Sequence, residues 1–189
     1  MDFLLNIDVS LFYFLNSTIA NPIFDFIMPI ITDQNNWYLI YFALILFLTI
    51  KYKQRGLIIV LALLVAVGIA DYLSSQVIKE AVGRLRPCRS LQDVHLLVPC
   101  GPGKSFPSSH AVNNFSLATV LAYNFKKYSW IFYSVAALIA FSRISVGAHY
   151  PLDVIGGAII GAIIGYLITL LFFKLIFKKL KSKPKINIE

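Results

Sequence analysis

The stretch His149–Phe173 reads HYPLDVIGGAIIGAIIGYLITLLFF, and it decides the fold class of this chain. A proline is favoured in the first turn of a helix, so Pro151 predicts that a helix begins here. The apolar run that follows, from about Leu152 to Phe173, has the length of roughly 20 residues that a helix needs to cross a hydrocarbon core. Small residues recur within it at every fourth position and predict close packing against a neighbouring helix. They are Gly157, Gly161 and Gly165.

Similar apolar runs occupy most of the remaining chain. Of the 189 residues, 58% are hydrophobic, whereas a soluble domain is about half apolar. Four further crossings are predicted at about Trp37–Ile50, Gly56–Val77, Ala111–Phe125 and Tyr128–Val146, of which the third is weaker because Asn113 and Asn114 interrupt it. Val9–Leu15 and Ile19–Ile31 form either one kinked span or an interfacial helix followed by a re-entrant segment. We therefore predict an all-α integral membrane helical bundle with five to six transmembrane helices, six being preferred.

The positive charges assign the two faces of the membrane. Basic residues of membrane proteins collect in cytoplasmic loops, and the predicted spans place eleven of the 17 lysines and arginines on one side. They are Lys51, Lys53, Arg55, Lys126, Lys127, Lys174, Lys178, Lys179, Lys181, Lys183 and Lys185. Residues 1–180 then form a single transmembrane domain, and residues 181–189 a basic cytoplasmic tail. The same rule accounts for the net charge of +8, so no nucleic-acid partner is expected. Met1–Leu5 carry an acid and no basic segment, so no cleaved signal peptide is expected.

Six basic residues remain on the extracytoplasmic face, against the usual bias. They are Lys79, Arg84, Arg86, Arg89, Lys104 and Arg143. Anion binding is a reason to place them there. Lys79, Arg86 and Arg143 supply the cations that a phosphoryl group needs during transfer. Pro107-Ser108-Ser109-His110 opens a helix, whose free backbone N–H groups and seryl hydroxyls add further donors.

The same face carries the residues for nucleophilic catalysis. Asp153 lies four residues after His149, so its carboxylate comes within reach of one ring nitrogen of that histidine. Such a contact fixes the tautomer and leaves the other nitrogen free to attack phosphorus. His110 can then protonate the leaving alcohol and later activate water.

The pattern Lys-x6-Arg-Pro, Pro-Ser-x-His and Ser-Arg-x5-His-x3-Asp resembles the type-2 phosphatidic acid phosphatase (PAP2) superfamily. The resemblance implies a lipid phosphatase without metal or cofactor, in which His149 becomes phosphohistidine, His110 is the acid and base, and Asp153 supports His149. It implies further that Lys79, Arg86, Arg143, Ser108 and the backbone of Ser109 hold the phosphate. The second motif usually reads Pro-Ser-Gly-His, and a serine at position 109 would be strained if the backbone there needs a positive φ.

Five residues outside the motifs also carry expectations. Cys88 and Cys100 lie in the outer loop, where a disulfide is favoured over two free thiols. Asp71 is expected to join a polar interhelical network near Ser74, Ser75 and Gln76 rather than to act in catalysis. His95 matches no motif and is expected to be a solvated loop residue. Arg84 lies outside the motifs, so its replacement by alanine is expected to have a mild effect.

Two other functions remain open at this stage. A lipid phosphotransferase would use the same phosphohistidine, and a non-catalytic anion channel or transporter would use the same cations. For the phosphatase, the resemblance to bacterial members offers lipid A 1-phosphate, undecaprenyl diphosphate, phosphatidylglycerophosphate and phosphatidic acid as substrates. The expected location is the inner membrane, with the active site on the periplasmic side and the C-terminus in the cytoplasm. Neither the choice among these lipids nor the oligomeric state can be predicted from the residues.

Overall fold

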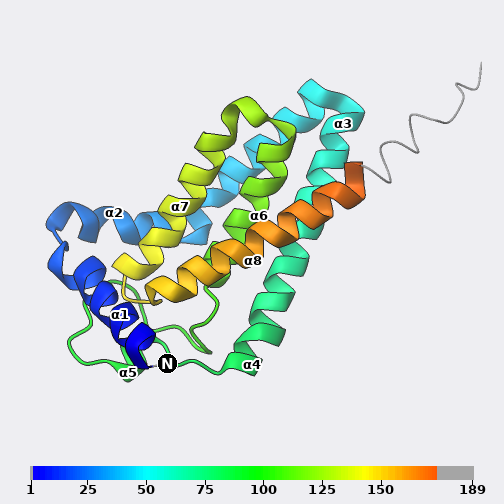
Figure 1. The fold of residues 1–189 in the computed structure, drawn as a ribbon. Coiled ribbons are helices and arrows are strands. Elements are labelled where there is room, and N and C mark those ends of the chain that lie inside the picture. The colour runs from blue at the N-terminus through cyan, green and yellow to red at the C-terminus, as the bar shows by residue number, and fades with distance from the viewer. Residues whose placement is uncertain (1, 174–189) are drawn as a thin grey trace, which may run out of the picture.

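The computed structural model describes residues 2–173, and within that range the chain consists of helices and connecting loops without strands (Figure 1). This confirms the all-α prediction. The α-helices are α1 (Asp2–Tyr13), α2 (Pro22–Thr32), α3 (Tyr38–Tyr72), α4 (Lys79–Val82), α5 (Pro87–Ser90), α6 (Ser109–Asn124), α7 (Ser129–Ser145) and α8 (Pro151–Leu170). Short π-helical and 3-10 segments link them: η1 (Phe14–Thr18), η2 (Gln34–Trp37), η3 (Leu73–Ile78) and η4 (Lys126–Tyr128).

Helix α3 contains two of the predicted crossings as the two arms of a hairpin. The chain reverses at Lys53, where φ is 49° and ψ is −125°. Gly56 lets the arms approach closely, because a Cβ atom there would lie 1.8 Å from the carbonyl oxygen of Leu48. Figure 1 shows the first arm running up to this reversal and the second arm returning toward α4.

Helix α8 packs against α6 through its small residues, as the glycine spacing predicts. A Cβ atom on Gly161 would lie 2.2 Å from the carbonyl oxygen of Val112, and one on Gly165 would lie 2.4 Å from that of Ser116. Only a residue without a side chain allows the backbones this close. The contact fixes the start of α6 relative to the start of α8, and the motif residues lie at both of these ends.

The N-terminal segment is bent rather than straight. The helical stretch Phe3–Thr18 meets α2 at an angle of 111°. Asn21 makes the bend, because its side-chain oxygen accepts hydrogen bonds from the backbone N–H groups of Ile23 and Phe24 and so starts a new helix. Helix α2 then packs against α7. Both alternatives for this segment, a broken span and a re-entrant segment, agree with the bend.

Within residues 2–173, two helical stretches are long and apolar enough to cross a membrane, Gln34–Ser90 and Pro151–Phe173, and the bent N-terminal pair would make a third. The first of them includes the α3 hairpin. Helices α6 and α7 have 16 and 17 residues, which is short for a full crossing. The total of five to six crossings therefore stays a prediction.

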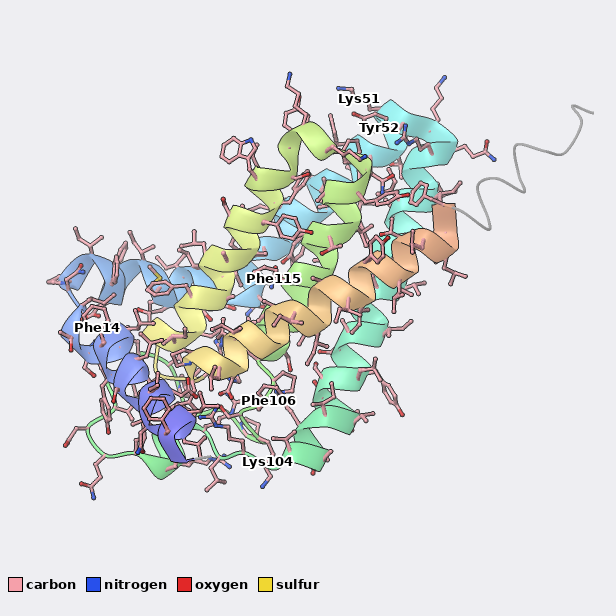
Figure 2. All side chains as sticks on the ribbon, in the orientation of Figure 1. Phe14, Lys51, Tyr52, Lys104, Phe106 and Phe115 are labelled. Atoms are coloured by element: carbon pink, nitrogen blue, oxygen red, sulfur yellow. A yellow bond between two sulfur atoms is a disulfide. The ribbon has the colours of Figure 1, made fainter. Side chains whose placement is uncertain are left out.

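The bundle has two distinct ends (Figure 2). Lys51 and Tyr52 lie at one end, where α3 reverses, and Lys104 and Phe106 lie at the other. The α6–α7 turn lies at the same end as the reversal of α3 (Figure 1), so the two basic turns share an end, as the charge pattern predicts. The lysines from Lys174 onward and the predicted tail 181–189 lie outside the described residues.

Candidate active site

The motif residues meet where the outer loop, residues 83–108, covers the starts of α6 and α8 (Figure 1). Asn16 ties this loop to the helices. Its amide nitrogen donates to the carbonyl oxygens of His95 and Ser145 at 2.8 Å each, and its oxygen accepts from the N–H of His95. The N-terminal segment therefore takes part in forming the site.

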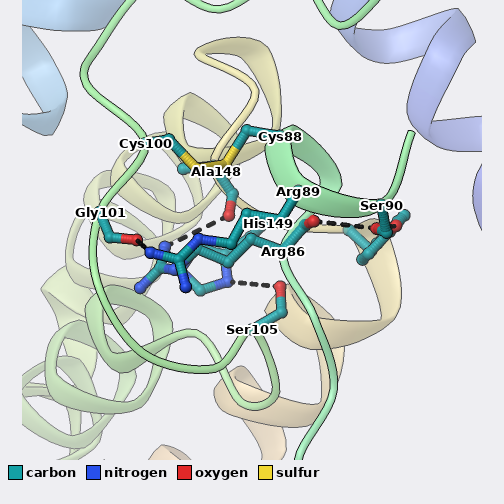
Figure 3. Close-up of a disulfide and its surroundings, with 10 residues drawn as sticks. Arg86, Cys88, Arg89, Ser90, Cys100, Gly101, Ser105, Ala148 and His149 are labelled. Atoms are coloured by element: carbon teal, nitrogen blue, oxygen red, sulfur yellow. Dashed lines mark hydrogen bonds between the residues drawn. A yellow bond between two sulfur atoms is a disulfide. The ribbon is translucent and has the colours of Figure 1, made fainter. Parts of the chain in front are cut away.

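His149 lies in the connection between α7 and α8, with its ring buried. The carbonyl oxygen of Arg143 accepts its backbone N–H at 3.1 Å. Ring atom Nε2 lies 3.3 Å from the guanidinium of Arg86 (Figure 3). A guanidinium can only donate, so Nε2 accepts and the ring hydrogen belongs on Nδ1.

The protein environment keeps the His149 ring neutral. Burial lowers the pKa of His149 to about 4, and the charges of Arg143 and Arg86 act in the same direction. The neighbouring carboxylate of Asp153 opposes these effects without cancelling them. At neutral pH the ring therefore has a lone pair on Nε2, next to the cation of Arg86.

Asp153 stands in the first turn of α8 and is fully buried. Its Oδ2 lies 3.6 Å from Nδ1 of His149, too long for a hydrogen bond. Ser105 bridges the two, because its hydroxyl donates to Oδ2 of Asp153 and lies 3.4 Å from Nδ1 of His149. The backbone N–H of Tyr150 adds a bond of 2.9 Å to the same oxygen. Sequence reasoning missed Ser105, which matches no motif position.

The structure corrects the placement of Arg84 outside the site. One guanidinium nitrogen lies 2.8 Å from Oδ1 of Asp153, and the other lies 2.6 Å from Oδ2 of Asp8 on α1. The expectation of a mild effect for Arg84→Ala rested on the motif spacing alone. The structure gives a reason to expect a larger effect, because this side chain is ion-paired with two buried carboxylates.

The three predicted phosphate-binding cations have no carboxylate partner within residues 2–173. In that range, the basic side chains within 4 Å of a carboxylate are Arg84, next to Asp8 and Asp153, His95, next to Asp25, and the neutral ring of His149, next to Asp153. Lys79, Arg86 and Arg143 nevertheless lie close enough to repel one another electrostatically. Such a cluster of like charges favours the binding of an anion.

Several donors around this cluster are also unused. Nε of Arg86, Nε of Arg143 and Oγ of Ser108 are buried and lack a hydrogen-bond partner in the described part of the chain. Buried polar groups are normally paired, so these three orphans call for a missing partner. All three belong to residues predicted to hold phosphate.

The first turn of α6 begins directly after Ser108, which is one of the predicted phosphate ligands. No side chain caps that turn, so its N–H groups stay available. The N–H of Ser108 itself donates to the carbonyl oxygen of Asp153 at 3.0 Å. Ser109 is helical, and the positive-φ non-glycine residues of the described chain are Lys53 and Asp93. Serine at position 109 therefore causes no backbone strain.

His110, in the first turn of α6, points one ring nitrogen at the end of α2. Its Nε2 lies 3.2 Å from the carbonyl oxygen of Thr32 and 3.5 Å from the side-chain nitrogen of Gln34. A carbonyl only accepts, so Nε2 carries a hydrogen and Nδ1 is left for chemistry. Oγ1 of Thr32 lies 2.6 Å from the guanidinium of Arg143. Sequence reasoning missed both Thr32 and Gln34.

Residues around the site also have defined partners. Cys88 and Cys100 are joined by a disulfide (Figure 3). Asp71 accepts a hydrogen bond of 3.2 Å from Asn113, in line with the expected polar network. His95 lies 2.9 Å from Asp25, so it is paired with α2 rather than only solvated.

The described residues contain no group of three or more His, Cys, Asp or Glu side chains placed to hold a metal ion.

A cavity of about 420 Å³ lies among both arms of α3, α6 and α7. Its lining is aliphatic or aromatic except for Asn114, one helical turn beyond His110.

Comparisons with known proteins place the chain in a family. The PAP2 superfamily model matches residues 56–177. A lipid A 4'-phosphatase from Bacteroides thetaiotaomicron is 34% identical over 170 residues, which cover 85% of this chain and 74% of that protein. An undecaprenyl-diphosphatase from Sulfolobus acidocaldarius is 31% identical over 109 residues, which cover 57% of this chain and 50% of that protein. The crystal structure of Aquifex aeolicus LpxE has a TM-score of 0.69 and 32% identity, and the match covers 85% of this chain and 93% of that one. The resemblance carried by the three motifs is confirmed, and this chain belongs to the PAP2 superfamily.

Proposed function

We propose that this membrane protein is a lipid phosphatase that hydrolyses a phosphate on a lipid head group through a phosphohistidine at His149. One observation carries the proposal. Lys79, Arg86 and Arg143 form a cationic cluster without carboxylate partners among residues 2–173, and Nε2 of a neutral histidine lies 3.3 Å from one of them. A phosphate bound to these cations would stand next to that lone pair.

The reaction follows from the placement of His149. Nε2 attacks phosphorus, a nitrogen–phosphorus bond forms, and the bond from phosphorus to the lipid oxygen breaks. The ring then becomes cationic, and the buried carboxylate of Asp153, linked through Ser105, stabilises it. The guanidinium groups of Arg86 and Arg143 hold the charge on the phosphoryl oxygens during the transfer.

His110 completes both halves of the reaction. The carbonyl oxygen of Thr32 holds the hydrogen on Nε2, so Nδ1 is the atom that exchanges protons with the substrate. The negative charge of a bound phosphate favours a second ring proton on Nδ1, and in the first step the cationic ring gives this proton to the leaving lipid alkoxide. In the second step Nδ1 takes a proton from water, which attacks the phosphohistidine and releases inorganic phosphate.

The apolar cavity supports a lipid as the substrate. Its polar end is close to the active site, because the amide of Asn114 donates to the carbonyl oxygen of His110 at 2.9 Å. From Asn114 the lining follows α6 as far as Leu121, a rise of roughly 10 Å. A hydrocarbon chain in this cavity would leave its head-group phosphate at the level of His110.

The head group stays open among lipid A phosphate, undecaprenyl diphosphate, phosphatidylglycerophosphate and phosphatidic acid. The names of two relatives, a lipid A 4'-phosphatase and an undecaprenyl-diphosphatase, favour testing the first two of these. We further propose that the site faces the periplasm, because the basic turns of the bundle lie at its opposite end.

The test is phosphate release by the detergent-purified protein from these four lipids in the presence of EDTA, alongside His149→Ala. Release that vanishes in the variant supports the proposal and ranks the substrates. Acid-labile, base-stable label retained by the protein from ³²P-lipid would support phosphohistidine. Transfer of label to an added lipid without free phosphate would instead indicate a phosphotransferase. No release and no transfer by folded protein would overturn the enzyme assignment.

A further inference from the structure

Arg84 differs from the other arginines of the site in how its guanidinium is used. Both terminal nitrogens are engaged, one with Asp153 at 2.8 Å and one with Asp8 at 2.6 Å. Its flat face lies 3.9 Å from the ring centre of Tyr150, within cation–π range. Arg86 and Arg143, by contrast, each have a buried Nε without a partner in the described chain. Arg84 therefore has little left to offer a phosphate.

Asp8 links the N-terminal helix to the same carboxylate. Its side chain is buried, with Oδ2 on Arg84 and Oδ1 accepting the backbone N–H of Leu152 at 2.8 Å. Leu152 directly precedes Asp153. One carboxylate on α1 thus fixes both the backbone next to Asp153 and the guanidinium that pairs with Asp153.

The arrangement also balances the buried charges. Asp8 and Asp153 are both buried, and two neighbouring carboxylates without a cation would be costly. Arg84 lies between them and bonds to Oδ1 of Asp153, while Ser105 and the N–H of Tyr150 bond to Oδ2. Rotation of the Asp153 carboxylate would break bonds on both oxygens.

We propose that Arg84 and Asp8 are positioning residues that hold Asp153 in the orientation that keeps the hydrogen of His149 on Nδ1 and leaves Nε2 free for attack. This inference rests on the proposed phosphatase function. It assigns the N-terminal helix a role in catalysis, although that helix carries none of the motifs.

If Arg84 positions Asp153, its loss should change kcat and the pH profile in a way that the loss of a purely structural residue would not. Chemistry slows because Asp153 is misoriented, while phosphate binding by Arg86 and Arg143 is retained, so kcat falls and KM changes little. The negative charge of Asp153 is no longer balanced by a nearby cation, so the pKa of His149 rises. The acid limb of the kcat/KM profile therefore moves to higher pH.

The experiment compares Arg84→Gln, Arg84→Lys and Asp8→Asn with Arg55→Gln as the matched control. Arg55 is an exposed arginine two residues after the reversal of α3, at the end of the bundle away from the site. For Arg84→Gln we expect kcat to fall roughly 10- to 100-fold, the size expected for lost bonds to a buried charged group. Arg84→Lys should recover part of this loss, Asp8→Asn should show a smaller fall of the same kind, and Arg55→Gln should match the wild type.

Three outcomes would overturn the inference. An unchanged kcat in Arg84→Gln would mean that Asp153 does not need Arg84 to hold its orientation. A raised KM with unchanged kcat would make Arg84 a phosphate ligand. An unshifted pH profile would leave Arg84 only a structural role.

If Arg84→Gln does not fold, Asp8→Asn provides the same test, because asparagine keeps an acceptor for the N–H of Leu152. If the wild type releases no phosphate from any lipid, the proposed function fails by itself. The ¹⁵N-histidine NMR titration of His149 without substrate then decides the inference, which requires an upward shift in the variants.

Discussion

The hydroxyl oxygen of Thr32 lies 2.6 Å from the guanidinium of Arg143, which joins the last residue of α2 to a predicted phosphate ligand on α7. The carbonyl oxygen of Thr32 also accepts the hydrogen of His110 Nε2 at 3.2 Å. Thr32 is buried, so neither bond competes freely with water. A single residue of the N-terminal segment therefore orients both a phosphate-binding cation and the proposed acid and base.

Thr32→Val separates these two roles, because valine keeps the backbone carbonyl and the shape but removes the hydroxyl. We expect weaker phosphate binding by roughly 10- to 100-fold, the loss of about 1.5–3 kcal/mol that a hydrogen bond to a charged group contributes. The measurement is the inhibition constant of inorganic phosphate, with Thr32→Ser as the variant that retains the hydroxyl. Thr18→Val, at an exposed threonine of the same segment, is the control. Unchanged inhibition would show that Arg143 does not depend on Thr32.

Ser105→Ala tests the bridge between Asp153 and His149. The variant removes the hydroxyl that donates to Asp153 and lies 3.4 Å from Nδ1 of His149. We expect kcat to fall by roughly 10- to 100-fold, the loss of about 1.5–3 kcal/mol for a hydrogen bond to a charged group, with KM nearly constant. Ser10→Ala, which removes an exposed hydroxyl of α1, should behave as the wild type. A rise in KM without a fall in kcat would instead indicate that Ser105 contacts the phosphate.

Residues on fixed spacings were predictable from the sequence. His149 and Asp153 are four residues apart around a helix start, and Ser108 and His110 flank another, so local geometry places each pair. The glycines of α8 likewise predict a tight helix contact, which the structure contains at Gly161. In each case the information lies within one helical turn or one repeated residue type.

The supporting residues could not be predicted in this way, because their partners are distant in the chain. Asp8 meets Arg84 across 76 positions, and Thr32 meets Arg143 across 111. Ser105 reaches Asp153 across 48 positions. Nothing local marks an aspartate or a threonine as the partner of a residue so far away.

The disulfide is expected to keep Arg86 in place. Cys88 lies two residues after Arg86, and a Cβ atom on Gly101, next to Cys100, would lie 3.7 Å from the central carbon of the Arg86 guanidinium. The double variant Cys88→Ser/Cys100→Ser should lose about 2–3 kcal/mol of stability by the loop-closure argument, together with a several-fold rise in KM. Thermal unfolding and kinetics measure both effects. If reductant changes neither property of the wild type, the loop holds Arg86 without the bridge.

The buried ring of His149 should make the folded protein less stable in acid. Burial lowers the pKa of His149 to about 4 in the folded protein from 6.5. Between these values the unfolded chain binds a proton that the folded protein does not. The free energy of unfolding therefore falls as the pH drops from about 6.5 to about 4, and this contribution stays constant below that range.

The non-titrating variant His149→Gln isolates this contribution. The wild type should lose more thermal stability than the variant between pH 7 and pH 5, measured by the unfolding midpoint in detergent. All other titrating groups are common to both proteins, so the difference reports His149. Equal losses would mean that the ring takes up its proton in the folded state as readily as in the unfolded chain.

The contact between α6 and α8 is expected to be the most sensitive packing position for activity. A Cβ atom on Gly161 would lie 2.2 Å from the carbonyl oxygen of Val112, and backbone cannot move aside as a flexible side chain can. Gly161→Leu must push α8 away from α6. The backbone N–H of Ser108 donates to the carbonyl oxygen of Asp153, at the start of α8, at 3.0 Å. The displacement would separate these two residues.

Gly68→Ala is the matched control, because a Cβ atom at that helical glycine meets nothing within 4 Å. Replacing an exposed helical glycine by alanine should even stabilise the protein slightly, by up to about 1 kcal/mol. Gly161→Leu should lower both the unfolding midpoint and phosphate release. Gly161→Ala should do so to a lesser degree, since one methyl group demands a smaller shift. Activity that survives Gly161→Leu in folded protein would mean that the site does not depend on this helix contact.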